Sequence, residues 1–141
     1  MNNFHSSVSS FSRTLSSFFD ERLSRFNFAT SYIELMILMN NNDQMSQKAI
    51  AEQLSLAPST ITRFVDKLKK EGYLTKKRDG RSVTIELTEK GRQVSKEMDA
   101  EYHSAVDEIR ELMGDKYLET VGKLLVYGSE KLNTDSEKPD K

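Results

Sequence analysis

The chain has 141 residues, 36% of them hydrophobic and 30% charged, and its 21 Lys and Arg against 22 Asp and Glu leave a net charge of −1. This length suits one domain with its own core. The absence of cysteine excludes disulfides, thiolate metal sites and cysteine-based redox chemistry. No stretch reaches the apolar length of a membrane span, so we expect no membrane partner and a cytoplasmic location.

The charges are unevenly distributed along the chain. Residues 46–92 carry 11 Lys and Arg and 6 Asp and Glu, a balance of +5, whereas the remainder carries 10 and 16, a balance of −6. A basic segment within an otherwise acidic chain is typical of contact with a polyanion. The central segment is therefore the first candidate for binding nucleic acid.

Residues 4–26 predict an amphipathic helix with an apolar stripe at alternating steps of four and three. Seven serines lie between residues 6 and 17, and serine is a poor helix former. We therefore expect this helix to be held by packing, against a second subunit. The stripe consists of Phe4, Val8, Phe11, Leu15 and Phe18.

A second, largely buried helix is predicted from the apolar run at residues 35–39. Ser31 and Glu34 precede it with the spacing of a capping box. The polar cluster at residues 40–43 then predicts a turn.

Residues 46–72 predict two helices joined by a tight turn. Pro58 suits the first turn of the second helix, where its missing N–H would be unpaired anyway, and Gly72 suits the end. The second helix turns one apolar face inward and leaves its polar side open. The inward residues are Ala49, Ile50 and Leu54 in the first helix and Ile61, Val65 and Leu68 in the second.

Strand-like patterns at residues 73–77 and 82–87, separated by the turn residues Asp79 and Gly80, predict a β-hairpin. Thr88 is a candidate N-cap for a long helix that ends near Gly114. A last helix follows, and residues 135–141 have the composition of a disordered tail. The predicted fold class is mainly α, an α+β winged helix-turn-helix core at residues 30–88 with a two-stranded wing, flanked by helices at 4–26 and 89–132 that serve dimerisation.

A helix-turn-helix places its second helix in the major groove of DNA, where Arg pairs with guanine and short hydroxyls reach bases or phosphates. The basic wing tip suits phosphates or the minor groove. We expect Asp79 to orient Arg81 through a carboxylate pair; the alternative is a surface turn with a weak ion pair. The candidate DNA-binding residues are Ser46, Gln47, Ser59, Thr60, Thr62, Arg63, Lys67, Lys70, Lys77, Arg78, Asp79 and Arg81.

The run from Ile50 to Arg92 resembles the winged-helix core of the MarR family of bacterial transcriptional regulators. The family's wing pattern is matched by Asp79, Arg81, Leu87, Thr88 and Gly91. The sequence departs from the pattern in a shorter wing, in Gly80 where a second Arg is common, in Ser55 where Gly often makes the turn, and in Ala57 at the N-cap. The resemblance covers the whole chain and implies one MarR-like domain over residues 1–134. It also implies a homodimer that binds double-stranded DNA at a pseudo-palindromic operator, as a repressor.

The resemblance further implies that many members bind a small aromatic effector between the dimerisation helices and the DNA-binding core, and then release DNA. The alternative is that an aromatic and Met stripe at helical spacing forms core. The candidate ligand-binding residues are Phe11, Phe18, Arg22, Phe26, Tyr32 and Met36.

The sequence contains none of the residue patterns that are typical of enzyme active sites. His5 and His103 are the only histidines and lack metal-ligand spacing, and there is no glycine-rich phosphate loop or nucleophile motif. We therefore expect no catalytic residue, no metal and no cofactor. The alternative function is a winged-helix dimer that acts as a protein-interaction adaptor, with DNA binding weakened by its short wing.

Overall fold

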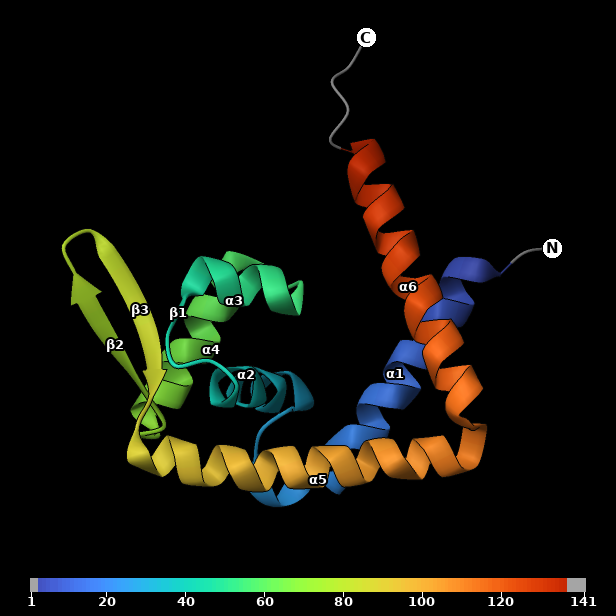
Figure 1. Cartoon of the computed structure of the whole chain (residues 1–141). Helices are drawn as coiled ribbons and strands as arrows, with labels where there is room; N and C mark the ends of the chain where they lie inside the picture. The colour runs from blue at the N-terminus through green and yellow to red at the C-terminus, as the bar shows by residue number, and fades with distance from the viewer. Residues whose placement is uncertain (1–2, 137–141) are drawn as a thin grey trace, which may run out of the picture. The chain divides into compact units, whose positions relative to one another are not determined.

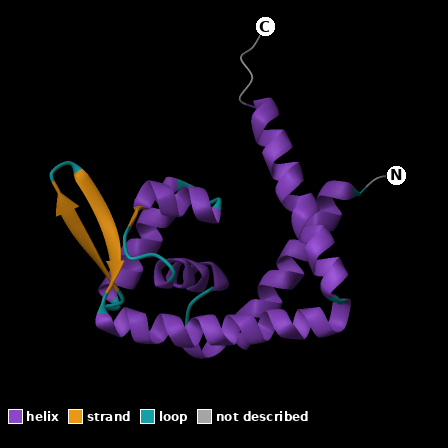
Figure 2. Cartoon of the chain, viewed as in Figure 1, coloured by secondary structure: helices purple, strands orange, loops and turns teal. Residues whose placement is uncertain are grey.

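The structure is a computed structural model that describes residues 3–136. It divides into two compact units, Met1–His103 and Ser104–Lys141, with the boundary inside a long helix. Within the described residues the fold is mainly helical with one small sheet (Figures 1 and 2), which confirms the predicted fold class. The elements are α1 (Phe4–Arg22), the 3-10 helix η1 (Ser24–Phe26), α2 (Thr30–Asn40), β1 (Met45–Ser46), α3 (Gln47–Leu54), α4 (Pro58–Lys70), β2 (Leu74–Asp79), β3 (Ser82–Leu87), α5 (Glu89–Met113) and α6 (Asp115–Ser136).

The core of the first unit is built around α2, which packs against α1, α3 and β3. Side chains from every element around it are removed from solvent, so the apolar run in α2 is central rather than one-sided. The largest fully buried side chains include Leu23, Ile33, Leu35, Met36, Met39, Ile50, Ile61, Leu68, Ile85 and Met98.

The start of α2 differs from the predicted capping box. The helix begins at Thr30, and its N-cap residue, Ala29, makes no side-chain cap. Instead, Oδ1 of Asp20 accepts hydrogen bonds from the backbone N–H of Thr30 at 2.9 Å and from its hydroxyl at 2.6 Å. The capping box was therefore the wrong prediction, because a carboxylate ten residues earlier in the chain takes the helix N-terminus.

The helix-turn-helix forms as predicted, and its turn explains one departure from the family pattern. Ser55 ends α3 in the left-handed region at φ 54°, the conformation that usually favours glycine. At the start of α4, Ala57 provides no side-chain cap and Pro58 occupies the first turn, while Gly72 follows the helix at φ 83°. The sequence signals at Pro58 and Gly72 are confirmed.

The sheet has three antiparallel strands in the order β1-β3-β2, one more than predicted. The extra strand, β1, pairs Met45 with Ile85, and its two residues are too few to show a periodic pattern. In the hairpin Asp79 pairs with Ser82, so the turn consists of Gly80 and Arg81 rather than Asp79 and Gly80.

The base of the wing is joined to α5 by three close contacts. The hydroxyl of Thr88 accepts from the N–H of Gly91 at 3.0 Å, which confirms the predicted N-cap, and donates to the carbonyl of Gly72 at 2.6 Å. A Cβ at Gly91 would clash with the carbonyl oxygen of Tyr73. Only glycine therefore lets α5 begin this close to the wing.

The second unit comprises the end of α5 and all of α6. Its helices expose large apolar side chains: Leu112, Met113, Tyr117, Leu124, Leu125, Val126, Tyr127 and Leu132. Because α6 extends to Ser136, the predicted tail begins at least two residues too early, and residues 137–141 lie outside the described part of the chain.

Candidate nucleic-acid interface

The two helices of the helix-turn-helix divide their side chains between core and solvent. In α4, Ile61, Phe64, Val65 and Leu68 are buried. The predicted contact residues lie on its other side: Ser59, Thr62, Arg63, Lys67 and Lys70 are exposed and Thr60 is half-buried. The structure therefore collects all six α4 candidates on the open side of one helix.

One side-chain hydrogen bond joins α3 to α4, and two more lie within these helices. Thr62 donates its hydroxyl proton to the carbonyl of Pro58 at 3.1 Å and accepts from the side-chain amide of Gln47 at 3.3 Å. Ser46 accepts from the N–H of Ala49 at 3.0 Å and so caps α3. Gln47 and Thr62 thus link α3 to α4, and Ser46 stabilises the start of α3.

Beneath the basic side chains of α4 lies a cluster of four rings, Phe28, Tyr32, Phe64 and Tyr73, which we call the aromatic cluster. Tyr32 stacks on Phe64 with ring centroids 3.9 Å apart, and Phe28 lies 5.4 Å from Tyr32. The ammonium of Lys67 lies 5.3 Å from the Phe28 ring and 5.1 Å from the Tyr32 ring. These contacts restrain Lys67 by cation–π attraction.

Sequence reasoning missed the aromatic cluster. It made Tyr32 a candidate ligand residue, and the structure stacks this ring on Phe64 of α4. Arg63 also stands over this cluster, its guanidinium 5.8 Å from the Phe64 ring. Arg63 and Phe64 are neighbours in the sequence, but Lys90 meets Tyr73, at 5.2 Å, only through the fold, so the sequence carried no signal for the cluster as a whole.

Two lysines of the wing form ion pairs with acidic side chains of the same chain. Lys76 pairs with Asp66 of α4 at 3.1 Å, and Lys77 pairs with Glu86 of the neighbouring strand at 3.0 Å. The first pair ties the wing to α4. The second pairs Lys77 within the sheet, yet its side chain stays 64% exposed, so its role in DNA binding stays a prediction.

The tip of the wing lacks the predicted internal pair. Arg78, Asp79 and Arg81 are all exposed, and among the described residues no ion pair joins Asp79 to Arg81. Asp79 sits in the strand ladder while Arg81 lies in the turn, so the orienting contact expected from the sequence does not form. The guanidinium groups of Arg78 and Arg81 have no acidic partner within residues 3–136.

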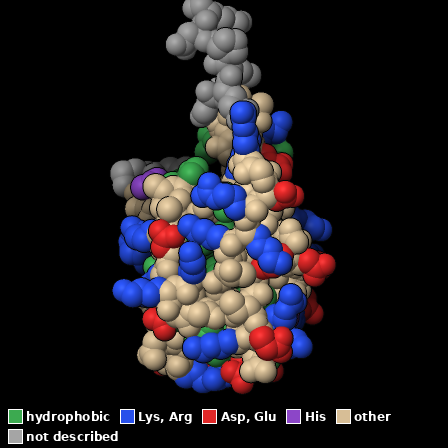
Figure 3. Space-filling view, turned by 90° about the vertical axis from the view of Figure 1, so that its left-hand side faces the viewer, with side chains coloured by type: hydrophobic (Ala, Val, Ile, Leu, Met, Phe, Trp, Pro, Cys, Tyr) green, Lys and Arg blue, Asp and Glu red, His purple; other side chains and the backbone are tan. Residues whose placement is uncertain are grey.

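Figure 3 shows the wing side of the molecule, with Lys and Arg spread over the face and Asp and Glu toward its margins.

The structure places the six predicted ligand residues in different surroundings. Met36 is completely buried in the core, and Phe26 is buried with the Arg25 guanidinium 4.2 Å from its ring. The Arg22 guanidinium lies 3.3 Å from the Phe18 ring centroid. Phe26 and Met36 therefore belong to the core, as the alternative reading held.

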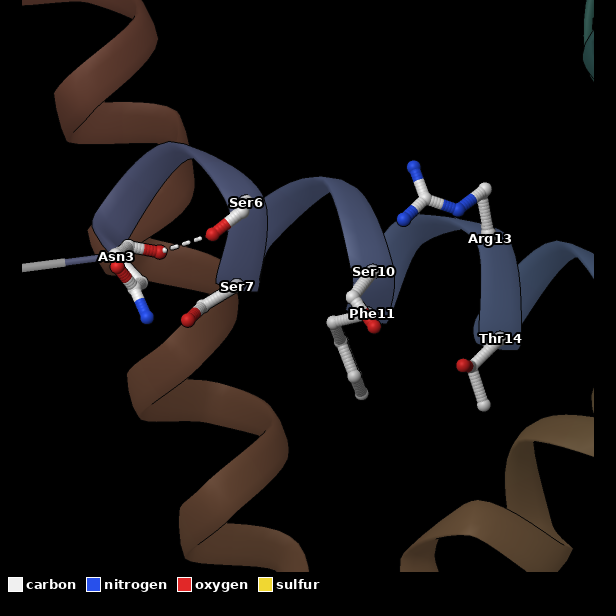
Figure 4. A pocket seen from close by; sticks show the side chains of 7 residues that line it. All are labelled: Asn3, Ser6, Ser7, Ser10, Phe11, Arg13 and Thr14. Carbon is white, nitrogen blue, oxygen red and sulfur yellow. Dashed lines mark hydrogen bonds between the residues drawn. The ribbon is translucent and has the colours of Figure 1, made fainter.

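Phe11 lies on an open surface along α1. Figure 4 shows it with Asn3, Ser6, Ser7, Ser10, Arg13 and Thr14, all from this helix or the residue before it. Ser6 donates to the backbone carbonyl of Asn3 at 3.0 Å. A surface made by one helix does not enclose a small molecule.

A different hollow, which the sequence did not indicate, opens between α2 and α3. It has a volume of about 240 Å³ and is lined by Glu34, Ile37, Leu38, Asn41, Leu54 and Tyr102. We call it the Glu34 groove. Burial raises the pKa of the Glu34 carboxyl above its usual 4.5, although a hydrogen bond from the Tyr102 hydroxyl at 3.4 Å acts in the opposite direction. Burial, and next the nearby Glu34 charge, raise the pKa of Tyr102 to about 12.

Between residues 3 and 136 no three His, Cys, Asp or Glu side chains gather as metal ligands would. None of the helices described there is both long and apolar enough to span a bilayer.

A protein-family model matches this chain. The family model described as transcriptional regulator SarA/Rot matches residues 24–98, which is more than half of the chain. An uncharacterized HTH-type transcriptional regulator of Bacillus cereus is 32% identical over 72 residues, 51% of this chain and 49% of the relative. The chain thus spans about half the length of this curated relative.

Solved structures share the fold over nearly the whole chain. The MarR protein from Peptoclostridium difficile superposes with a TM-score of 0.80 at 21% identity, covering 95% of this chain and 90% of that one. NadR in complex with 4-hydroxyphenylacetate gives a TM-score of 0.72 at 20% identity, covering 90% and 92%. At such identities these likenesses establish the fold alone.

Proposed function

The chain belongs to the SarA/Rot family of transcriptional regulators and has the winged helix-turn-helix fold of the MarR regulators, and from this premise we propose that it represses transcription as a DNA-bound homodimer. The family is one of regulators and not of enzymes. In this proposal α4 lies in the major groove and the wing tip lies beside the neighbouring minor groove. Such a regulator acts in the cytoplasm of a bacterium, where the DNA is.

The observation that carries the proposal is the exposed side of α4. Ser59 and Arg63 are exposed and able to meet base edges, while the Thr62 hydroxyl is engaged by Gln47 and Pro58 and Lys67 lies over the aromatic cluster. Arg78 and Arg81 extend the basic surface to the wing tip. On such a face, the polar side chains of α4 can contact base edges in the major groove, and the cations around them can contact phosphates.

The homodimer is supported by apolar side chains that the single chain leaves open. In α1, Phe4 is 71% exposed and Val8 40%, and in α6, Leu124 is 63% and Leu132 71% exposed. Large apolar side chains exposed in this number along a helix mark an interface. Light scattering is expected to give about twice the 16.2 kDa of the chain; a monomer at micromolar concentration would contradict the dimer.

The operator is expected to be pseudo-palindromic, with half-site centres about one helical turn, roughly 10 bp, apart, because a two-fold dimer presents two copies of α4. If six to ten phosphates are neutralised, the logarithm of affinity falls with the logarithm of salt concentration at a slope of about −5 to −9. Retention on random DNA at low salt tests the class of function. A chain that does not bind would favour the adaptor role.

Base readout is tested by a matched pair of substitutions in α4. Arg63→Ala is expected to relax base preference at one position per half-site, at a cost of roughly 1 to 3 kcal/mol. Lys70→Ala removes an equal charge farther along the same exposed face and is expected to weaken all sequences alike. If Arg63→Ala lost the same affinity for specific and for random DNA, Arg63 would be a phosphate contact. Base recognition would then be expected from Ser59, Thr60 or Thr62.

The proposal includes release of DNA by a small effector. One structural neighbour, NadR, was solved with 4-hydroxyphenylacetate, which supports an effector in a protein of this fold. Repression itself is tested by a reporter gene placed behind the operator. Deleting the regulator is expected to raise transcription, and a fall would show activation instead.

A further inference from the structure

The Glu34 groove combines an apolar lining with one carboxylate. Ile37 and Leu38 of α2 and Leu54 of α3 provide apolar wall, and polar groups come from Glu34 of α2 and from Asn41, the C-cap residue of that helix about two turns farther on. A smaller hollow lined by Ser31, Glu34, Leu54 and Leu56 adjoins it, with a volume of about 60 Å³. Together they offer room for a small molecule, at the lower end of the sizes typical of ligand sites.

The groove carries negative charge without compensation. No Lys, Arg or His is among its lining residues, and within residues 3–136 no cation pairs with Glu34. Its one polar contact is the Tyr102 hydroxyl at 3.4 Å, which is long for a hydrogen bond to a carboxylate. The Coulomb attraction between this half-buried carboxylate and a cation is stronger than it would be in bulk water, because the effective dielectric constant is lower there.

We propose that the Glu34 groove binds the effector, and that this effector is an amphiphilic monocation, an aromatic or branched alkyl ammonium. Its ammonium lies against the Glu34 carboxylate and its apolar body against Ile37, Leu38 and Leu54. This inference rests on the proposed function, because it names the chemical class of the effector. It separates this chain from NadR, whose structure holds the anion 4-hydroxyphenylacetate: an anion in this groove would face Glu34 with no cation to receive it.

The Glu34 groove lies where a bound ligand can change the affinity of the chain for DNA. Leu54 is the last residue of α3, so the occupant touches the first helix of the helix-turn-helix. Tyr102 of α5 stacks on Phe19 of α1, with ring centroids 4.8 Å apart. A ligand that prefers one arrangement of α3 against α2 and α5 thereby shifts the population of the DNA-binding arrangement.

The test compares three probes of similar size and different charge on the full chain: benzyltrimethylammonium, 4-hydroxyphenylacetate and the neutral 4-hydroxyphenylacetamide. Methyl chemical-shift titration of Ile37, Leu38 and Leu54 reports occupancy directly and does not require DNA. For a probe of this size we expect a dissociation constant of roughly a millimolar or below. The cation is expected to bind at least tenfold more tightly than the anion.

Substitutions assign the charge preference to one residue. Glu34→Gln keeps the shape and is expected to weaken cation binding about tenfold while leaving the neutral probe unchanged. Glu52→Gln, on the exposed face of α3, makes the same change in net charge and is expected to leave all three affinities unchanged. Tyr102→Phe retains the carboxylate and removes its hydrogen-bond donor, so it is expected to keep or strengthen cation binding.

Several outcomes would overturn the inference: equal or tighter binding of 4-hydroxyphenylacetate, no saturable methyl shift with the cation, or unchanged cation affinity in Glu34→Gln. The proposed function is judged separately by DNA binding without any probe. If the chain binds DNA and the cation fails to bind the groove, the inference fails and the proposed function stands. If the chain does not bind DNA, the proposed function fails whatever the probes show.

Discussion

The ammonium of Lys67 lies 5.1 Å from the ring centroid of Tyr32, across the gap between α4 and α2. Lys67 is therefore restrained by a residue outside the helix that reads DNA. A cation–π contact of this kind contributes about 0.5–2 kcal/mol. Fixing the side chain before binding also lowers the entropy lost on docking.

Tyr32→Leu is accordingly expected to weaken DNA binding about three- to tenfold on every sequence, because it frees Lys67 without altering a base contact. Tyr32→Phe keeps the ring and serves as the matched control, with little expected loss. A double-mutant cycle measures the link: in a Lys67→Ala background, Tyr32→Leu should add little. Additive losses in fluorescence anisotropy titrations would show that Tyr32 acts only through packing.

The second prediction concerns the wing tip, where the structure reverses an expectation drawn from sequence. Without an ion pair between Asp79 and Arg81, the carboxylate acts as a negative charge close to phosphates. Asp79→Ala is therefore expected to bind DNA more tightly, with the gain fading at high salt. Asp79→Glu, which retains the charge, should leave affinity close to that of the parent. Weaker binding by Asp79→Ala at low salt would restore the orienting role.

The helix-turn-helix and wing were predictable because their signals are local. Pro58, Gly72 and Thr88 act through backbone geometry within a few residues, and each does in the structure what its type predicts. The charge segregation in residues 46–92 likewise survives folding, since lysines and arginines stay on the surface.

What could not be predicted depends on residues distant in the chain. Tertiary packing decides that Asp20, and not Ser31, caps the N-terminus of α2. It also brings Tyr102 to Glu34, 68 residues away in the chain. The aromatic cluster also joins Phe28 to Tyr73, with ring centroids 6.2 Å apart. A single sequence shows the periodicity of each helix but not which neighbour its half-buried face meets, and so the contact of Tyr32 with Phe64 was not predicted.

The third prediction tests the junction of wing and α5. Gly91→Ala gains helix propensity but places a methyl group against the carbonyl oxygen of Tyr73, which already accepts from the N–H of Thr88 at 3.0 Å. The steric cost should prevail and lower the free energy of unfolding by about 1–3 kcal/mol in urea denaturation. Gly122→Ala in α6, where a Cβ meets no atom within 4 Å, is the control and should be neutral or stabilising. Equal behaviour of the two variants would show that α5 shifts freely at its start.

The last prediction follows from the raised pKa of Glu34. Burial raises this pKa above 4.5 in the folded chain, so above that pH the folded state holds a proton that the unfolded state has released. The free energy of unfolding must then fall as pH rises through the interval between the two values. The stabilising contribution of the protonated form is complete below pH 4.5 and is lost above the folded-state pKa.

Glu34→Gln removes this dependence. It is expected to be more stable than the parent at pH 7 and equally stable near pH 4, as measured by urea denaturation across that range. Glu52→Gln, on the exposed face of α3, should follow the parent at every pH. If Glu34→Gln were instead less stable at pH 7, the carboxylate would be gaining more from its contact with Tyr102 than it loses by burial. The Glu34 groove would then hold a satisfied anion rather than one that needs a cation, and the proposed charge preference of the effector would lose its physical basis.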